Sequence, residues 1–279
     1  MIDIKKFKDF RDYAKFNQEF IDSNPMLYYH LENTIKRVFK GKGKTPQLHK
    51  FFNVIGNNCF VAVLLIDSEC LIYADNINDE IVDKLSEGIE FHLFKRYQFF
   101  GTKQIIDALF QKHKVEYDEQ KYRIIYECKS VLADFEYSPG KMNMADEQRL
   151  LELAAFNVAF TKEYFGDTQD LEKAVQIIAS GISNDNLYQW NFENNICAMA
   201  QAIHGDYNFP VIGHVFTNPS FRNKGYAASI VHRLTKGLLE AGAEKCMLST
   251  NAYTPASNKA FIKAGYIQTG EYIVRYKKK

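Results

Sequence analysis

The sequence predicts an α/β (α+β) protein with a mixed, mostly antiparallel sheet, flanking helices and two related domains. Its 279 residues are enough for one large domain or two ordinary ones. Apolar residues make up 46% of the chain and charged residues 25%, which is a soluble globular composition. Both halves show helix, helix, hairpin, helix and strand patterns in a similar order, so two copies of one fold are expected.

The first half is expected to begin with a helix, because apolar residues recur at helical spacing from Ile4 to Ala14. Asn24 and Pro25 then start a second helix that runs to about Phe39, since proline is tolerated in a first turn. The further elements expected are a loop at 40–45, hairpin strands at 51–55 and 59–66, helices at 77–85 and 102–113, and a strand at 122–132.

The clearest break in the chain is Ser138-Pro139-Gly140-Lys141, which places a domain boundary between residues 137 and 138. Asn143 or Asp146 can cap the next helix, whose apolar side includes Phe160. Asp167 or Thr168 starts another helix, which Gly181 ends. The remaining elements expected are strands at 187–193, 196–203 and 211–217, a helix at 228–240, a strand at 245–250, a helix at 256–263 and a strand at 267–276.

Charge and cysteine content exclude several classes of protein. Lys and Arg total 35 against 34 Asp and Glu, a net charge of +1, so no nucleic-acid partner is expected. The five cysteines are odd in number and widely spaced, which argues against a disulfide framework and favours a cytoplasmic protein. The sequence shows no secretory signal and no apolar run of about 20 residues, so no membrane partner is expected. The seven histidines show no metal-ligand spacing, so no metal is expected.

The most informative segment joins the strand at 211–217 to the following helix. A helix N-terminus presents free backbone N–H groups and a partial positive charge, which suits a phosphate. Gly225 lets the backbone approach an anion, Arg222 and Lys224 add positive charge, and Ala227 is small. An ordinary loop would satisfy the same pattern, since one glycine before a helix is a weak signal.

The pattern Arg222-x-x-Gly225-x-Ala227 after a strand resembles the pyrophosphate loop of the GNAT acyltransferase superfamily. The segment Ser257–Tyr266 resembles a later helix of that superfamily, which usually ends in a Gly-aromatic pair. The likeness is strongest over 211–272 and extends more weakly back to 144. It implies a GNAT-type acyl-CoA N-acyltransferase that moves an acetyl group from acetyl-CoA directly to a primary amine.

The resemblance also implies which residues bind acetyl-CoA. Backbone N–H groups from Asn223 to Ala227 would hold the pyrophosphate, and the strand before the loop would pair with the pantetheine arm. Asn251 and Asn258 lie where the family contacts the cofactor or shapes its channel. The complete expected set is Val215, Phe216, Thr217, Arg222, Asn223, Lys224, Gly225, Tyr226, Ala227, Asn251, Asn258 and Phe261.

The family's general acid is usually a tyrosine at the position of Phe261, which has no proton to donate. Tyr253 or Tyr266 could substitute, the thiolate could leave unaided because its thiol pKa is roughly 8.5, or activity could be impaired. His214 is the first candidate for the general base, since histidine titrates near neutrality, although a buried structural histidine fits as well. Glu193, at the end of a hairpin strand, is the second candidate.

Residues 1–137 lack such a loop, and the nearest echo is Phe100-Gly101-Thr102-Lys103 before a helix. This resembles tandem GNAT proteins whose first copy is degenerate, so we predict a degenerate GNAT-like domain at 1–137 and an acetyl-CoA-binding domain at 138–279. The expected acceptor is a small-molecule or peptide amine. A CoA-binding module without transfer and an interaction scaffold remain alternatives, because one fold hosts many functions. The sequence predicts no oligomeric state.

Overall fold

A computed structural model describes residues 2–40, 47–89, 97–205 and 207–278. Most of the loop predicted at 40–45 therefore lies outside the described residues. The chain forms two compact units: unit 1 comprises Met1–Ile125 and Thr269–Lys279, and unit 2 comprises Tyr126–Gln268. None of the helices in the described ranges combines the length and the apolar character needed to cross a membrane.

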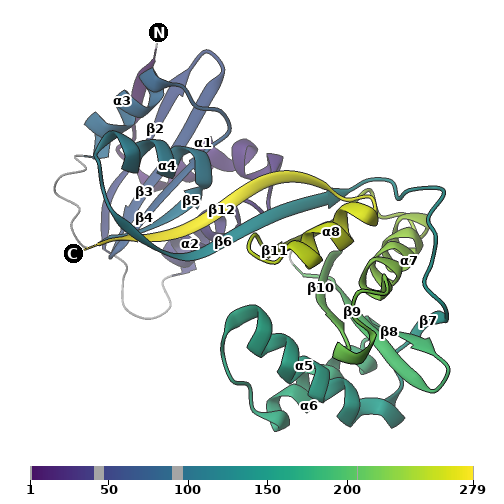
Figure 1. Cartoon of the computed structure of the whole chain (residues 1–279). Helices are drawn as coiled ribbons and strands as arrows, with labels where there is room; N and C mark the ends of the chain where they lie inside the picture. The colour runs from purple at the N-terminus through teal and green to yellow at the C-terminus, as the bar shows by residue number, and fades with distance from the viewer. Residues whose placement is uncertain (1, 41–46, 90–96, 206, 279) are drawn as a thin grey trace. The chain divides into compact units, whose positions relative to one another are not determined.

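Unit 1 is a sheet with helices on its faces (Figure 1). Its elements are β1 (Asp3–Lys6), α1 (Phe10–Ser23), α2 (Tyr29–Lys40), β2 (Leu48–Gly56), β3 (Cys59–Ile66), β4 (Glu69–Ala74), α3 (Asp79–Ile89), β5 (Gln98–Thr102), α4 (Lys103–Lys112) and most of β6 (Tyr117–Cys128). The strand order is β1-β2-β3-β4-β5-β12-β6, where β12 (Ile267–Lys277) is the last strand of the chain. Strands β4 and β5 run parallel. Residues Val61 to Ile66 of β3 are fully buried, as expected for a central strand covered on both faces.

Unit 2 repeats this order of elements. It contains β7 (Lys141–Met144), α5 (Leu150–Phe165), α6 (Leu171–Ser183), β8 (Leu187–Phe192), β9 (Asn195–Ile203), β10 (Val211–Thr217), α7 (Tyr226–Glu240), β11 (Cys246–Asn251) and α8 (Pro255–Lys263), followed by the start of β12. Its strands lie in the order β11-β10-β9-β8-β7, antiparallel except for β10 and β11. The predicted fold class, a mixed and mostly antiparallel sheet with flanking helices, is confirmed.

The start of the chain differs from the prediction. Asp3–Lys6 form strand β1, in which Ile4 pairs with Val54 of β2, and no helix begins before Phe10. The apolar spacing from Ile4 onward was produced by a strand followed directly by a helix. Asp9 caps that helix, its carboxylate accepting a hydrogen bond from the Arg11 backbone N–H at 2.7 Å.

Several other boundaries moved, and four short strands were missed. Strands β1, β4, β5 and β7 are four to six residues long. Helix α2 begins at Tyr29, because Asn24 accepts a hydrogen bond from the Leu27 N–H and closes a turn instead. Helix α6 begins after Asp170, which makes no side-chain cap hydrogen bond, and continues past Gly181 to Ser183.

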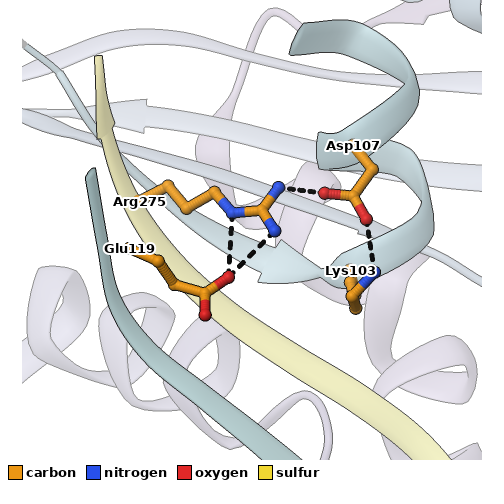
Figure 2. Close-up of polar contacts among 4 residues, drawn as sticks. All are labelled: Lys103, Asp107, Glu119 and Arg275. Atoms are coloured by element: carbon orange, nitrogen blue, oxygen red, sulfur yellow. Dashed lines mark hydrogen bonds and ion pairs between the residues drawn. The ribbon is translucent and has the colours of Figure 1, made fainter. Parts of the chain in front are cut away.

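The C-terminal strand belongs to unit 1. Strand β12 pairs with β5 from Tyr272 to Tyr276 and carries Arg275, which is only 3% exposed. The Arg275 guanidinium contacts Asp107 on α4 and donates to the Glu119 carboxylate at 2.9 and 3.1 Å, while Lys103 pairs with Asp107 (Figure 2). The side of unit 1 that carries α4 and β6 is therefore tied to the last residues of the chain.

The segment before the predicted boundary packs on unit 2. The buried ring of His232 on α7 donates from Nε2 to the Leu132 carbonyl at 2.8 Å, and its Nδ1 lies 2.9 Å from the Tyr137 hydroxyl. The same ring stacks on Phe135 with centroids 4.0 Å apart. The compact units therefore divide the chain at 125/126 and 268/269, whereas the composition break had suggested 137/138.

Candidate functional site

Strands β10 and β11 of unit 2 separate at the site. The two parallel strands pair at Val211 and Met247. Among the described residues, no further position of β10 pairs with β11. On its other edge β10 shifts register against β9 between Gly213 and Phe216. His214 lies in this bulge with φ of 49°, a conformation uncommon outside glycine. Bulges bend a strand, so the backbone of β10 is free to turn away from β11.

Helix α7 begins at Gly225 without a side-chain cap. Gly225 is the N-cap residue, with φ of 82°, and no side chain accepts from the first turn. The first intrahelical bond runs from the Ser229 N–H to the Gly225 carbonyl, so the preceding N–H groups have no helical partner. A Cβ at residue 225 would lie 2.9 Å from the Ser138 hydroxyl in a backbone conformation that L-residues avoid. Glycine is therefore required here, and the helix start is suited to an anion.

A pocket of about 460 Å³ opens at this helix start. Its walls come from α5, the end of β10, the loop before α7, the first turn of α7 and α8. The residues that line it are Phe160, Glu163, Tyr164, Val215, Phe216, Thr217, Phe221, Arg222, Asn223, Gly225, Tyr226, Ala227, Ala228, Thr254, Ala256, Ser257, Lys259, Ala260, Phe261 and Lys263. Its cationic side chains are Arg222, Lys259 and Lys263, against the single carboxylate of Glu163, which favours an anionic ligand.

Arg222 is held at the pocket by α5. Its Nη2 donates to both Glu163 carboxylate oxygens at 2.8 and 2.9 Å, and its Nε donates to the Thr217 carbonyl at 3.2 Å. The two side chains are 40% and 52% exposed, so water screens the pair. An incoming phosphate can therefore compete with Glu163 for the guanidinium.

His214 lies beside the pocket and is not among the described residues that line it. Its Nδ1 is 3.1 Å from Asn157 Nδ2, and the ring lies 5.3 Å from that of Phe160. The Gln169 amide donates to Asn157 Oδ1 at 3.0 Å, so Asn157 presents its N–H to His214. In this arrangement Nδ1 accepts and Nε2 carries the proton of the neutral ring. Burial lowers the pKa of His214, which favours that neutral form.

The other predicted catalytic groups lie apart from the pocket. Tyr253 is 70% exposed and does not belong to the described pocket lining. Tyr266 is buried, with its hydroxyl 2.7 Å from that of Thr235. Glu193 lies in the exposed turn between β8 and β9. Phe261 does line the pocket, where its side chain offers no hydroxyl group.

Asn251 and Asn258 build the turn between β11 and α8. The Asn258 amide donates to the Asn251 carbonyl at 3.1 Å and to the Thr254 carbonyl at 2.9 Å, and Asn251 Oδ1 accepts from the Tyr253 N–H. Neither asparagine belongs to the described pocket lining, and nor does Lys224. The side chains of Asn251 and Asn258 instead shape the turn that leads into α8, and α8 carries pocket-lining residues from Ala256 onward.

Sequence reasoning missed the contribution of α5. Phe160, which was expected on the apolar side of this helix, packs against the core of unit 2 and also lines the pocket together with Glu163 and Tyr164. The spacing i, i+3, i+4 puts the three on one helix face. The Tyr164 hydroxyl donates to the Ser249 carbonyl of β11 at 3.4 Å. The sequence signal that could have indicated this contribution was the presence of Glu163 and Tyr164 on the same face of the helix as Phe160.

No metal site accompanies the pocket: over the described ranges, no group of three or more His, Cys, Asp or Glu could hold an ion. The five cysteines are buried free thiols. Burial raises the pKa of Cys246 to about 12 and that of Cys128 to about 11, so these thiols are not reactive nucleophiles.

Unit 2 thus combines a mixed sheet, two parting parallel strands and an uncapped helix start. Residues 151–266 match the model of the Acetyltransferase (GNAT) family. The matched segment covers most of unit 2 and less than half of the chain. That family generally uses acetyl-CoA as its co-substrate, and the family and fold together support an acyl-CoA-dependent acyltransferase.

Solved structures extend the similarity of fold to the whole chain. An acetyltransferase of the GNAT family from Colwellia psychrerythraea matches with a TM-score of 0.56 and 17% identity, covering 99% of this chain and 100% of that one. A GCN5-related N-acetyltransferase from Sphaerobacter thermophilus matches with a TM-score of 0.54 and 12% identity, covering 98% and 94%. At these identities the likeness shows the fold alone. No curated protein matches the sequence.

Proposed function

We propose that unit 2 binds acetyl-CoA and transfers its acetyl group to a primary amine of a small molecule or peptide. The observation that carries this proposal is the uncapped start of α7 at Gly225, which opens on a pocket lined by Arg222, Lys259 and Lys263. Backbone N–H groups and cations together are the usual means of binding phosphates.

The pocket also suits the pantetheine arm. Beyond Val211 strand β10 has no pairing with β11 among the described residues, and Val215, Phe216 and Thr217 line the pocket. A strand edge left open in this way can pair with the amide groups of an extended ligand. The N–H groups from Asn223 to Ala227 would hold the pyrophosphate.

For the proton of the attacking amine we keep His214 as the proposed acceptor. Its pKa is lowered by burial, so the ring is neutral near pH 7. A lone pair on Nε2 requires the Nδ1–H tautomer, which in turn requires the side-chain amides of Asn157 and Gln169 to turn over. Tyr253, the acid we predicted, is supported by no contact with the pocket.

A CoA-binding module without transfer is the second candidate. The observation in its favour is Phe261, which occupies the family's acid position on the pocket wall. A panel of primary amines distinguishes the two candidates: release of CoA above background supports transfer, and cofactor binding without any release supports the module.

We further propose that unit 1 is a GNAT-like copy that does not bind acyl-CoA. It has the element order of unit 2, but its β4 and β5 stay paired over four positions, from Glu69–Gln98 to Ile72–Gly101. The echo at Gly101 lies in β5 before α4, not at the β4–α3 junction that corresponds to the β10–α7 junction of unit 2.

The first test is thermal unfolding with and without acetyl-CoA. Ligand at 100 times its Kd stabilises the folded state by about 2.7 kcal/mol, so a clear rise in Tm is expected. No shift at millimolar acetyl-CoA would contradict binding and favour an interaction scaffold.

A further inference from the structure

Two tyrosines line the pocket, Tyr164 on α5 and Tyr226 at the start of α7. Tyr226 is 3% exposed, and its hydroxyl lies beside the thiol of the buried Cys197. That hydroxyl therefore points into the protein. Tyr164 is half-buried, with its ring stacked on Phe160 at 5.3 Å between centroids.

The Tyr164 hydroxyl lies where β11 has left β10. It donates to the carbonyl of Ser249, two residues beyond the Val211–Met247 pair. The donor–acceptor distance is 3.4 Å, at the long end of the hydrogen-bond range, so a closer acceptor can replace the carbonyl. Tyr164 thus lines the pocket from α5 with its hydroxyl bonded to β11, while Phe261 lines the same pocket from α8.

The remaining tyrosines near α8 are engaged away from the pocket. Tyr126 is 2% exposed and donates to Asn258 Oδ1 at 2.9 Å. Tyr266 is equally buried against Thr235, and Tyr253 is 70% exposed. Among the tyrosines that the structure describes in unit 2, Tyr164 is the one that lines the pocket and donates from its hydroxyl to a carbonyl of β11.

We propose that Tyr164 is the proton donor to the leaving thiolate, in place of the hydroxyl that Phe261 lacks. This inference rests on the proposed acetyl transfer. The amine nitrogen bonds to the thioester carbonyl carbon, and the carbon–sulfur bond breaks with its electron pair on sulfur. The Tyr164 hydroxyl proton passes to that sulfur, the amine proton passes to the base, and the phenolate regains a proton from water. CoA thiol and an amide are the products.

The experiment measures CoA release by full-length wild type and Tyr164→Phe, with the primary amine that gives the fastest wild-type release. General acid catalysis contributes about 10²-fold or more, so Tyr164→Phe is expected to lower kcat by that order. The ring and its stacking on Phe160 remain, so KM for acetyl-CoA and the acetyl-CoA thermal shift are expected to stay within about twofold of wild type. Tyr188→Phe, which removes a hydroxyl that donates to the Asp185 carbonyl at 3.4 Å outside the pocket, is the matched control and should retain wild-type kcat.

A rescue variant separates proton donation from a structural role. Tyr164→Phe combined with Phe261→Tyr restores a hydroxyl on the opposite wall, and we expect it to regain at least tenfold in kcat over Tyr164→Phe. Unchanged kcat in Tyr164→Phe overturns the inference. A lower kcat also overturns it if the acetyl-CoA thermal shift is lost as well and the added Phe261→Tyr does not restore kcat. If wild type shows a thermal shift but releases no CoA with any amine, the proposed transfer is refuted and this inference with it. If wild type is active and Tyr164→Phe has the same kcat, the inference alone is refuted.

Discussion

The two units contain the same parallel strand pair and differ in how far it stays together. In unit 1, β4 and β5 are paired at four successive positions from Glu69–Gln98 to Ile72–Gly101. In unit 2, β10 and β11 are joined at Val211–Met247, and β10 carries the bulge at His214. Gly101 packs against the Ile72 backbone so closely that a Cβ could not be inserted, which closes the sheet of unit 1 at the place where unit 2 opens.

Helix α3 follows β4 in unit 1 and helix α7 follows β10 in unit 2, and the N-termini of these two helices also differ. Asn78 caps α3, its side chain accepting from the Ile81 N–H at 2.9 Å, and Asp79 and Glu80 add negative charge to the first turn. Helix α7 has Gly225 as its N-cap and no acidic residue in its first turn. An anion is thus repelled at one helix start and attracted at the other. One element order is compatible with both, so the site depends on local departures within a shared fold.

The arginines of the two units make a second contrast. Arg275 in unit 1 is 3% exposed among carboxylates, whereas Arg222 in unit 2 is 40% exposed and pairs with a half-exposed Glu163. Buried ion pairs are costly to break from one side, and exposed pairs contribute little to stability. We therefore expect Arg275 to matter for folding and Arg222 to matter for ligand binding.

The largest effect is expected from Arg275→Met. The change leaves Asp107 and Glu119 without their guanidinium partner, which should lower the free energy of unfolding by about 3 kcal/mol. Urea denaturation measures this loss. Arg222→Met is the matched control and should cost under about 1 kcal/mol. Equal losses in the two variants would contradict the contrast between the arginines.

Gly225→Val is expected to remove acetyl-CoA binding. The valine would require a φ near 82° and would press on Ser138, so the helix start could not keep its shape. The roughly 2.7 kcal/mol of stabilisation by ligand at 100 times its Kd should disappear from the thermal shift. Gly237→Val on the same helix, with nothing within 4 Å of its Cβ, should keep the shift. A shift retained by Gly225→Val would indicate a second site and would break the comparison between the units.

A smaller effect is expected from Glu163→Gln. It removes the carboxylate that holds Arg222 and the negative charge on the pocket wall, so acetyl-CoA should bind a few-fold more tightly, a change under about 1 kcal/mol. Titration calorimetry at low and high salt measures the gain and its screening. Glu152→Gln breaks an ion pair with Arg149 at the start of α5 and should leave Kd unchanged. Weaker binding in Glu163→Gln would show that the carboxylate positions Arg222 for the ligand.

The smallest effect is the pH dependence from His214 and His232 of unit 2. Burial lowers the pKa of both rings, so the folded state binds fewer protons than the unfolded state, whose histidines titrate near 6.5. Their contribution to stability is present above that pH and is lost as pH falls through the folded pKa values. The urea midpoint should therefore be lower at pH 5.5 than at pH 7.5. The difference between the two pH values should be smaller in His232→Asn than in wild type. An unchanged midpoint would show that neither ring is held neutral.

The sequence predicted most long elements, because burial on one face leaves a period. The hairpin of β2 and β3, helices α3, α4, α7 and α8, and strands β8 to β11 all lie within a few residues of their predicted ranges. The prediction failed where local pattern was too short or ambiguous, as at β1, where Ile4 and Phe7 mimic a helix until β2 provides a pairing partner.

The candidate site divides along the same line. The loop from Arg222 to Ala227 could be predicted, because a glycine before a helix and the cations beside it are adjacent in sequence. Glu163 and Tyr164 could not, since they reach the pocket only through the packing of α5 on β10. The roles assigned to His214 and Tyr253 depended on side-chain direction, which no spacing encodes.

By itself the sequence determined the class of fold, the glycine-dependent helix start and the loss of the usual tyrosine at Phe261, because each of these is a property of adjacent residues. Tertiary structure alone decided that the last strand completes unit 1 through Arg275, that β10 parts from β11, and that Tyr164 lines the pocket. Each of these depends on contacts between residues far apart in the chain, whose free energy is set by burial and pairing in the folded state.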